Sequence, residues 1–331
     1  MDSLLKCLST GDERISDSIV YAQNKVIGLM RPAVIEGVKD KKSGYIAGPK
    51  GIIELPLPAT AEAVLEALIS SGSILFGDED QVIAARELLL DESSSRTASY
   101  FCCVARNCQE LIDAFKRIKN ARVLVIGCGG IGSLVTIQLA GAGIEDLVLI
   151  DPDTIEVSNL NRQFVWEKSD AGRPKVDVLK KALERRYSLR SCQALMQRIE
   201  DDQLDELTQG VDVVVLSADE PLGVAQAKLQ ALSQKKGFLT ISCGYYQNTA
   251  LVKVFGKSET QSNDDFDAIK WARTPSFIGP SFGPMNVEIA GVVASSAIQA
   301  LGFPESTSWR NENSGLGLSW VPFERREAFL N

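Results

Sequence analysis

A glycine-rich turn and a carboxylate stand at the spacing that suits nucleotide binding. The apolar run 123–126 leads into the turn, a helical pattern follows, and a second apolar run, 146–150, ends in Asp151. The glycines of the turn are Gly127, Gly129, Gly130 and Gly132. Glycines let the backbone approach phosphates, the N-terminus of the next helix faces their charge, and a carboxylate after the second strand accepts from ribose hydroxyls. The segment therefore predicts a nucleotide-binding strand, turn, helix and strand.

Two cationic residues follow this unit within 25 positions of Asp151 in the sequence. Arg162 lies in the run NLNRQ, residues 159–163, and Lys175 ends the run GRPK. A guanidinium binds phosphate in a bidentate fork and an ammonium acts as a point charge, so the pair suits chemistry at the α-phosphate of a triphosphate. A dehydrogenase has no use for two cations just beyond the ribose carboxylate. The competing interpretation is a pair of solvated surface cations in a loop before a helix.

These motifs, in this order, resemble the ThiF/MoeB superfamily, to which the ubiquitin-activating enzymes belong. The shared features are a GxGGxG turn, an Asp-x-Asp after the second strand (Asp151 and Asp153), an N-L-x-R-Q box, and a Lys in G-x-x-K. An acidic residue after a later strand is shared as well, and here it is Asp219 in VDVVVLSADEP. The resemblance covers about residues 122–301 and implies an α/β fold, a Rossmann-like adenylation domain with a mixed sheet.

The resemblance also implies a reaction and a set of roles. A carboxylate attacks ATP in the presence of Mg2+, giving an acyl-adenylate and pyrophosphate, so cations must screen the charge of the transition state. The implied catalytic residues are Arg162, Lys175, Asp219 and Arg96. The implied nucleotide contacts are Gly127, Gly129, Gly130, Gly132, Asp151, Asp153, Asn159 and Gln163. Asp219 would position the magnesium ion, and its alternative role is a helix N-cap before Pro221.

The role of Arg96 depends on a second copy of the chain. In many relatives an arginine from before the first strand completes the site across a dimer interface. The matching region here is SRTASYF, residues 95–101, in which Arg96 is the one arginine, and Arg106 is a further candidate. The resemblance thus implies a homodimer.

The cysteine pattern and the absence of histidine limit the metal sites, covalent intermediates and general bases that can be expected. Seven cysteines are dispersed with no Cys-x-x-Cys pair, so neither a disulfide framework nor the structural zinc site of many relatives is expected. None lies between Gly244 and Asn331, the region that supplies a nucleophilic cysteine in thioester-forming relatives, so a thioester relay is not expected. Without histidine, proton transfer falls to carboxylates, Lys, Tyr, Cys or the substrate.

Composition agrees with a cytoplasmic enzyme of two domains. The chain has 331 residues, 45% of them hydrophobic, which is enough for a sizeable core. Its formal charge of −8 and the lack of a long basic run make nucleic acid and anionic membranes poor partners. The N-terminus lacks the cationic start and apolar core of a signal peptide, and the apolar segment 289–301 is short for a membrane span.

Alternating elements after the cations must complete the nucleotide domain, residues 96–331. The periodicity predicts helices over 174–187, 222–233 and 287–301, the last following a stretch broken by Pro and Gly. It predicts strands over 211–216, 238–243 and 249–255. A polar loop over 256–267 is of a length that is usually functional or disordered.

Residues 1–95 lie outside the nucleotide fold. They predict strands at 25–29, 45–47 and 51–55, then helices at 59–70 and 79–89 and a Ser/Asp-rich linker at 91–95. This order and size suit a small winged-helix-like α+β module. Its acidic balance disfavours DNA, whereas a peptide can add as a strand to a sheet edge. The alternative is a dimerisation or packing extension.

Such a module in front of this domain is similar to the peptide-modifying branch of the superfamily, which includes microcin-type peptide adenylases and pantocin-type peptide cyclases. The resemblance implies that residues 1–95 bind the leader of a ribosomal precursor peptide. It implies adenylation of a carboxylate, a Glu side chain in the pantocin-like case, followed by intramolecular attack and ring formation in antibiotic biosynthesis. The alternatives are adenylation of a peptide or sulfur-carrier C-terminus, an NAD-dependent oxidoreductase, and a non-catalytic peptide-binding subunit.

Overall fold

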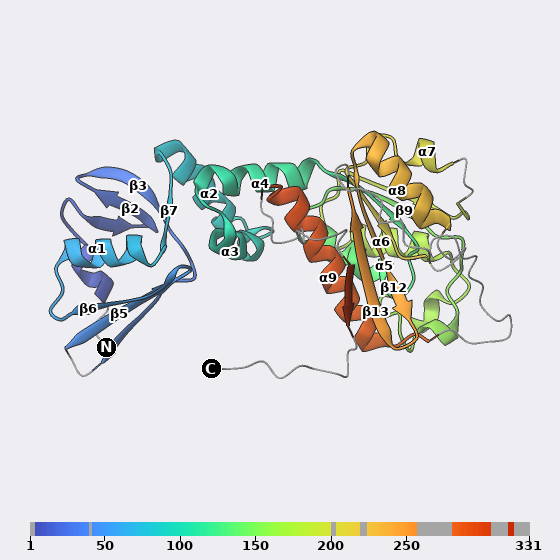
Figure 1. The fold of residues 1–331 in the computed structure, drawn as a ribbon, viewed down its shortest axis with the longest axis horizontal. Coiled ribbons are helices and arrows are strands. Elements are labelled where there is room, and N and C mark those ends of the chain that lie inside the picture. Colours follow the sequence, from blue (N-terminus) through green and yellow to red (C-terminus); the bar gives the residue numbers. More distant parts are fainter. Residues whose placement is uncertain are drawn as a thin grey trace. The chain divides into compact units, whose positions relative to one another are not determined.

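The computed structural model describes residues 4–39, 42–199, 203–218, 224–256, 280–305 and 317–320. The chain divides into two compact units, Met1–Lys116 and Arg117–Asn331 (Figure 1). This division lies beyond the boundary predicted at residue 95, because α3 (Ser95–Val104) and most of α4 (Cys108–Asn120) group with the first unit. The assignment of the two parts to recognition and adenylation stays a prediction.

The first unit is built from two antiparallel sheets and short helices. One sheet has the order β1-β2-β3-β7 and the other the order β4-β5-β6. Apolar residues of both sheets pack with α1 (Ala61–Ser70) and the 3-10 helix Leu4–Leu8 in one core, and a capping box at Asp78 begins α2 (Glu79–Leu90). The strands are β1 Arg14–Ser16, β2 Ile19–Ala22, β3 Lys25–Met30, β4 Ile35–Lys39, β5 Ser43–Gly48, β6 Gly51–Pro56 and β7 Ile74–Phe76.

The α+β class of this unit is confirmed, and so are the three strands and two helices expected in it. Four further strands, β1, β2, β4 and β7, were not predicted. Positive φ angles at Asp17 and Ser18, and again at Gln23 and Asn24, form the two-residue turns that join β1, β2 and β3. Neither turn contains the Asn-Gly or Asp-Gly pair by which such a hairpin can be predicted from sequence.

The second unit contains a seven-stranded mixed sheet in the order β10-β9-β8-β11-β12-β13-β14, as the predicted fold class requires. The five strands from β10 to β12 run parallel, and β13 and β14 are antiparallel additions. The chain order reverses between β8 and β11, and in such sheets ligands bind at the carboxyl ends of the strands beside this switch point. The strands are β8 Arg122–Ile126, β9 Asp146–Ile150, β10 Ser191–Leu195, β11 Val213–Leu216, β12 Leu239–Tyr246, β13 Thr249–Phe255 and β14 Gly317–Trp320.

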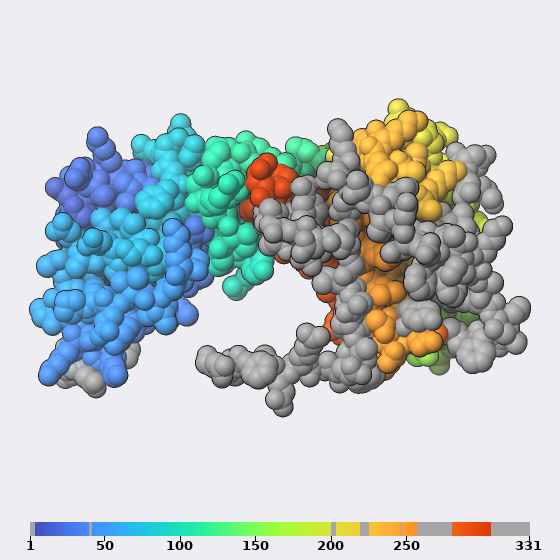
Figure 2. All heavy atoms as spheres, viewed as in Figure 1, coloured from blue at the N-terminus to red at the C-terminus, as the bar shows by residue number. Residues whose placement is uncertain are grey.

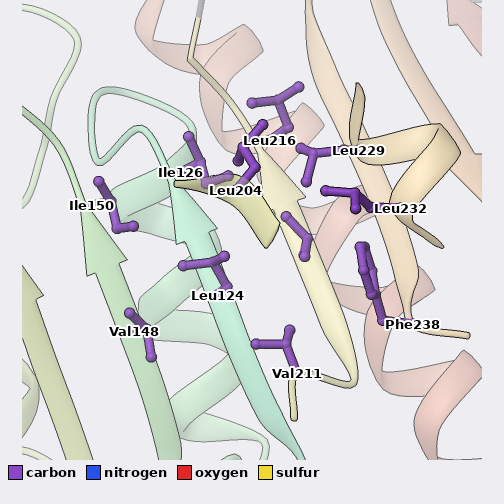
Figure 3. Packing of buried hydrophobic residues seen from close by; sticks show 11 residues of the cluster. Leu124, Ile126, Val148, Ile150, Leu204, Val211, Leu216, Leu229, Leu232 and Phe238 are labelled. Carbon is purple, nitrogen blue, oxygen red and sulfur yellow. The ribbon is translucent and has the colours of Figure 1, made fainter. Parts of the chain in front are cut away.

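Helices cover both faces of this sheet. On one face, Leu204 of α7 and Leu229 of α8 belong to one buried cluster with residues of the central strands, among them Leu124 and Leu216 (Figure 3). On the other face α5 contacts β8 and both neighbouring helices, α6 and α9. The outer side of α8 reaches the surface (Figure 2). The helices are α5 Gly132–Gly141, α6 Lys175–Glu184, α7 Leu204–Leu207, α8 Val224–Lys236 and α9 Gly283–Gly302.

The expected helices and strands of this unit are confirmed, with ends that shift by a few residues. Helix α9 begins at Gly283, four residues before its predicted start. It is also the one described helix that is long and apolar enough to cross a membrane, with a mean hydropathy of 1.2 over its most apolar window. Half of that stretch is buried, and α9 contacts α5, β12 and β13.

Leu124 anchors the core of the second unit. It is fully buried on the central strand β8. Leu124→Ala should lower the free energy of unfolding by about 2–5 kcal/mol, because the change removes buried methyl groups and leaves a cavity. Urea denaturation followed by circular dichroism measures the loss. Met196→Ala, at a half-exposed apolar side chain, is the control and should change the free energy by less than about 1 kcal/mol.

Candidate functional site

The glycine turn lies at the switch point of the sheet. Gly127 follows β8 with φ +88°, and a Cβ there would lie 2.7 Å from the backbone nitrogen of Ala218. The hydroxyl of Ser217 donates to the Gly127 carbonyl at 2.7 Å. Only glycine accepts this conformation at this close approach, so the ends of β8 and β11 fix the turn that precedes α5.

Gly129 has a different reason to be glycine. A Cβ at this position would meet a single atom within 4 Å, the Nε2 of Gln163 at 3.8 Å. Its φ is not in the left-handed region, so neither strain nor protein packing demands a glycine. The space beside Gly129 leaves the backbone open to a phosphate group, which is what the predicted role of the turn requires.

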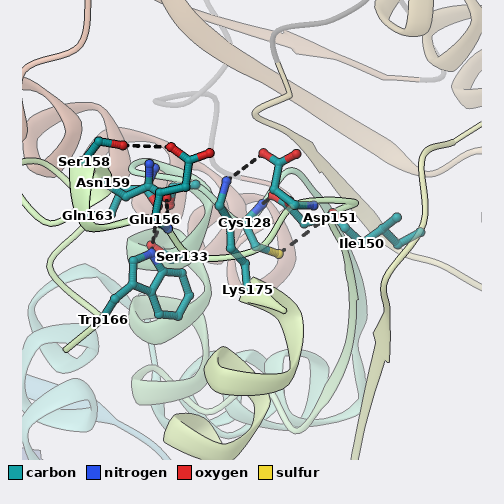
Figure 4. A network of polar contacts seen from close by, with 12 residues as sticks. Cys128, Ser133, Ile150, Asp151, Glu156, Ser158, Asn159, Gln163, Trp166 and Lys175 are labelled. Carbon is teal, nitrogen blue, oxygen red and sulfur yellow. Dashed lines mark hydrogen bonds and ion pairs between the residues drawn. The ribbon is translucent and has the colours of Figure 1, made fainter. Parts of the chain in front are cut away.

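Asp151 ties the turn to the neighbouring strand. Its Oδ2 accepts from the backbone N–H of Cys128 at 2.6 Å and its Oδ1 from that of Asp153 at 2.9 Å (Figure 4). Burial raises the pKa of this carboxyl above its usual value, while nearby Lys175 and the two N–H groups oppose the shift. Each carboxylate oxygen retains a lone pair, so Asp151 can still accept from a ribose hydroxyl.

Lys175 brings a buried cation to the same edge. It opens α6, its residue is 6% exposed, and its Nζ pairs with Asp153 Oδ2 at 2.7 Å. The backbone N–H of Lys175 also donates to the Asp153 carbonyl at 3.1 Å. The lysine is thus held from both ends by one residue. An ammonium held in this way is placed to meet an anionic ligand.

The loop around Arg162 is ordered by its own polar groups. Asn159 Oδ1 accepts from the N–H of Glu156 at 3.1 Å, and Arg162 Nη1 donates to the Ser158 carbonyl at 2.8 Å. Gln163 Oε1 accepts from Trp166 Nε1 at 2.7 Å (Figure 4). Asn159 and Gln163 are buried and hold the loop, whereas Arg162 is half-buried and available to a ligand.

Five of the predicted residues line one cleft of about 370 Å³. The cleft is lined by Pro152, Asp153, Thr154, Glu156, Asn159, Arg162, Gln163 and Lys175. The glycines and Asp151 border the same region, since Gly129 faces Gln163 and Asp151 bonds to Asp153. The structure therefore brings Arg162 and Lys175 together in one cleft, with the glycine turn and Asp151 beside it, and the roles of these residues in nucleotide binding stay predictions.

Two predicted residues are not placed in this cleft. Asp219 lies outside the described residues, so its part in magnesium binding stays a prediction. Arg96 is exposed on α3, in the other unit, and its role across a dimer interface also stays a prediction. Within the described ranges, no cluster of three or more His, Cys, Asp or Glu side chains could hold a metal ion.

Sequence reasoning missed Asn286, which belongs to this site. The side chain is 1% exposed near the start of α9, and its Nδ2 donates to the carbonyl of Arg162 at 3.0 Å. The signal was present as a single asparagine in the apolar stretch GPMNVEIAGVV. Nothing in the sequence shows that α9 folds back onto the Arg162 loop.

The fold and the cleft define a nucleotide-binding α/β domain with two cations beside its phosphate turn. The chain belongs to the ThiF family, whose model matches residues 105–319. This match covers more than half of the chain and confirms the superfamily that the motifs predicted.

Individual relatives match parts of the chain. A molybdopterin-synthase adenylyltransferase of Salmonella typhimurium is 40% identical over 102 residues, 31% of this chain and 41% of that protein. A sulfur carrier protein ThiS adenylyltransferase of Escherichia coli is 31% identical over 142 residues, 43% of this chain and 50% of that protein. The chain thus spans half or less of the length of these curated relatives.

Solved structures match more of the chain at lower identity. E. coli MccB, crystallised with a succinimide, has a TM-score of 0.66 at 21% identity and covers 88% of this chain and 95% of that one. PaaA has a TM-score of 0.64 at 17% identity, with 88% and 96% covered. At these identities the likeness shows the fold alone.

The two glycines of the turn give a paired test. Gly127→Ala should lower the free energy of unfolding by about 1–3 kcal/mol, because an alanine at positive φ is strained and would press on Ala218. Gly129→Ala should change stability by less than about 0.5 kcal/mol but weaken ATP binding, because its methyl group occupies the open space. Urea denaturation and calorimetric titration with ATP separate the two effects. Undiminished ATP affinity in Gly129→Ala would show that phosphate does not bind at this turn.

Proposed function

We propose that this protein is an ATP-dependent adenylating enzyme that activates a carboxylate. The observation that carries the proposal is the placement of Arg162 and Lys175 in one cleft beyond the carboxyl end of β9, next to the glycine turn. Attack of a carboxylate on the α-phosphate joins two anions, and the charge that builds up on the phosphoryl oxygens requires fixed cations. The curated relatives named above are adenylyltransferases, which supports the same reaction.

The residues of the cleft suit the separate parts of ATP. The turn from Gly127 to Gly132 and the N-terminus of α5 would receive phosphates, and Asp151 the ribose. Arg162 and Lys175 would neutralise the triphosphate and polarise the α-phosphorus. Magnesium would screen the remaining charge and would be held by Asp219.

The first step of this reaction needs no general base. A carboxylate is ionised near neutral pH, so its oxygen can form the bond to the α-phosphorus while the bond to pyrophosphate breaks. The absence of histidine from the chain is therefore no obstacle to adenylation. Only the second step, attack of a nucleophile on the acyl-adenylate with loss of AMP, releases a proton that a base must accept.

The substrate we propose is a ribosomal precursor peptide bound by residues 1–95. The fold likeness to MccB and PaaA spans 88% of the chain, and MccB has been crystallised with the peptide MccA. Within the described part, β4 and β6 end the three-stranded sheet and offer edges to which a peptide strand can add. The activated group would be a Glu side chain, and an intramolecular attack would close a ring as in pantocin-like biosynthesis.

Activation of a C-terminus is the second candidate. The ThiS adenylyltransferase match favours it, since the name of that relative specifies a sulfur carrier protein. In either case we propose a cytoplasmic homodimer. Mass spectrometry with ATP, magnesium and precursor peptides encoded beside the gene separates the cases. Loss of water from the peptide with formation of AMP and pyrophosphate indicates ring closure, a stable adenylyl adduct indicates C-terminal activation, and no nucleotide turnover contradicts the enzymatic proposal.

Lys175 and Lys180 form a matched pair on α6. Lys175 is buried in the cleft, whereas the side chain of Lys180 is 38% exposed and lies 3.8 Å from Glu184. Lys175→Ala should reduce peptide-dependent pyrophosphate release at least about 100-fold, because a fixed cation is lost from the transition state. Lys180→Ala should leave the rate unchanged. An NAD-dependent enzyme would retain activity in Lys175→Ala, so equal rates in both variants would contradict adenylation.

Arg96 can be tested by mixing inactive variants. Arg96→Ala and Lys175→Ala should each be inactive, but dimers formed from the two chains together contain one site with both residues intact. The mixture should therefore recover about a quarter of wild-type pyrophosphate release if Arg96 acts on the partner's site. Full activity of Arg96→Ala alone would exclude it, and Arg106→Ala would then be tested in the same way.

A further inference from the structure

Asn286 stands where three segments distant in sequence meet. Its Nδ2 donates to the Arg162 carbonyl at 3.0 Å. A Cβ on Gly130 would lie 3.0 Å from the Asn286 Cγ and 3.2 Å from the same carbonyl. One amide therefore packs against the glycine turn and bonds to the main chain of the loop that carries the catalytic cation.

The Asn286 side-chain amide uses its NH2 group as a donor, but its oxygen accepts no hydrogen bond among the described residues. Its Oδ1 is buried and has no hydrogen-bond partner among the described residues. A buried acceptor left without a partner destabilises the folded state, and an apolar side chain of similar volume would avoid that cost. Packing alone is thus a poor reason for an asparagine at this position of α9. The donor half, directed at Arg162, is the part that explains it.

The other hydrogen bonds of Arg162 are local. Its N–H donates to the Asn159 carbonyl at 3.1 Å, and its Nη1 donates to the Ser158 carbonyl at 2.8 Å and to Asn161 Oδ1 at 3.1 Å. Among the described residues, Asn286 is therefore the sole hydrogen-bond partner of Arg162 from outside its own loop. The local bonds shape the loop, but they do not fix its distance from the glycine turn.

We propose that Asn286 is a positioning residue that fixes Arg162 against the phosphate-binding turn. The inference rests on the proposed function, because it assumes that Arg162 acts on ATP. Helix α9 packs on α5, which begins at that same turn, so α9 is a rigid element from which the amide can set the position of the loop. Without the donor, the loop keeps its internal bonds and the guanidinium loses its fixed place beside the phosphates.

The test is a double-mutant cycle with a non-hydrolysable ATP analogue, AMPCPP, bound in the presence of magnesium. Asn286→Leu should weaken binding about tenfold in the wild-type background and less than about twofold in Arg162→Ala, because the effect passes through the guanidinium. Asn286→Leu should lower the melting temperature by the same amount in the wild type and in Arg162→Ala. The reason is that the backbone carbonyl of residue 162, to which Asn286 donates, is present in both. Calorimetric titration and thermal unfolding supply the two readouts.

Ser296→Ala is the matched control, because among the described residues this hydroxyl on α9 bonds only to the Val292 carbonyl one turn earlier, at 2.8 Å. It should leave the affinity for AMPCPP unchanged. Asn286→Asp, which has the same size but faces the carbonyl with an oxygen, repeats the cycle if the leucine variant does not fold. Equal losses of affinity in both backgrounds, or no loss in the wild-type background, would overturn the positioning role.

The two proposals fail in different ways. If the wild-type protein binds no AMPCPP, the proposed function is wrong and the role of Asn286 with it. If the wild type binds the analogue and Arg162→Ala weakens binding while Asn286→Leu does not, adenylation stands and only the positioning role is wrong.

Discussion

The carboxylate of Asp151 is the interaction on which the rest of the site depends. It lies at the end of β9 and accepts the backbone N–H of Cys128 in the turn that follows β8. A buried carboxylate is costly unless hydrogen bonds compensate, and here two N–H groups do so. The same two bonds fix the turn before α5 and the start of the segment that carries Asp153. The glycine turn and the start of the segment that carries Asp153 therefore take their positions from one side chain.

The ion pair between Asp153 and Lys175 positions the lysine ammonium group without burying both of its members. The lysine side chain is 7% exposed and the aspartate side chain 61% exposed, so the pair is buried on one side only. In the proposed ATP complex Asp153 would turn into solvent at little cost, whereas Lys175 would keep its place at the start of α6. A partner that was itself buried would oppose this exchange, because separation would leave an uncompensated charge.

Local patterns carried most of the prediction. The glycine turn, Asp151 and the two cations follow from short motifs, and most strands and helices of the second unit follow from apolar periodicity. The short elements β10, α7 and β14 were not predicted. The hairpins β1–β2 and β2–β3 were missed because β1 and β2 are short. Their turns use Asp17 and Ser18, and Gln23 and Asn24, at positive φ instead of a recognisable Asn-Gly or Asp-Gly pair. Asn286 escaped for another reason. Its contact with Arg162 spans 124 positions, and no local pattern encodes the packing of α9 on the turn.

The cysteines bear on how an activated carboxylate would be consumed. Burial raises the pKa of Cys102 to about 12 and those of Cys108 and Cys192 to about 11, and it raises that of Cys128 well above its usual value. A thiol attacks as thiolate, so these four are poor nucleophiles near neutral pH. These four thiols are therefore poorly suited to accept the acyl group of an acyl-adenylate, whereas direct transfer to a nucleophile of the substrate needs no protein thiol. Direct transfer of this kind is what ring closure within a bound peptide requires.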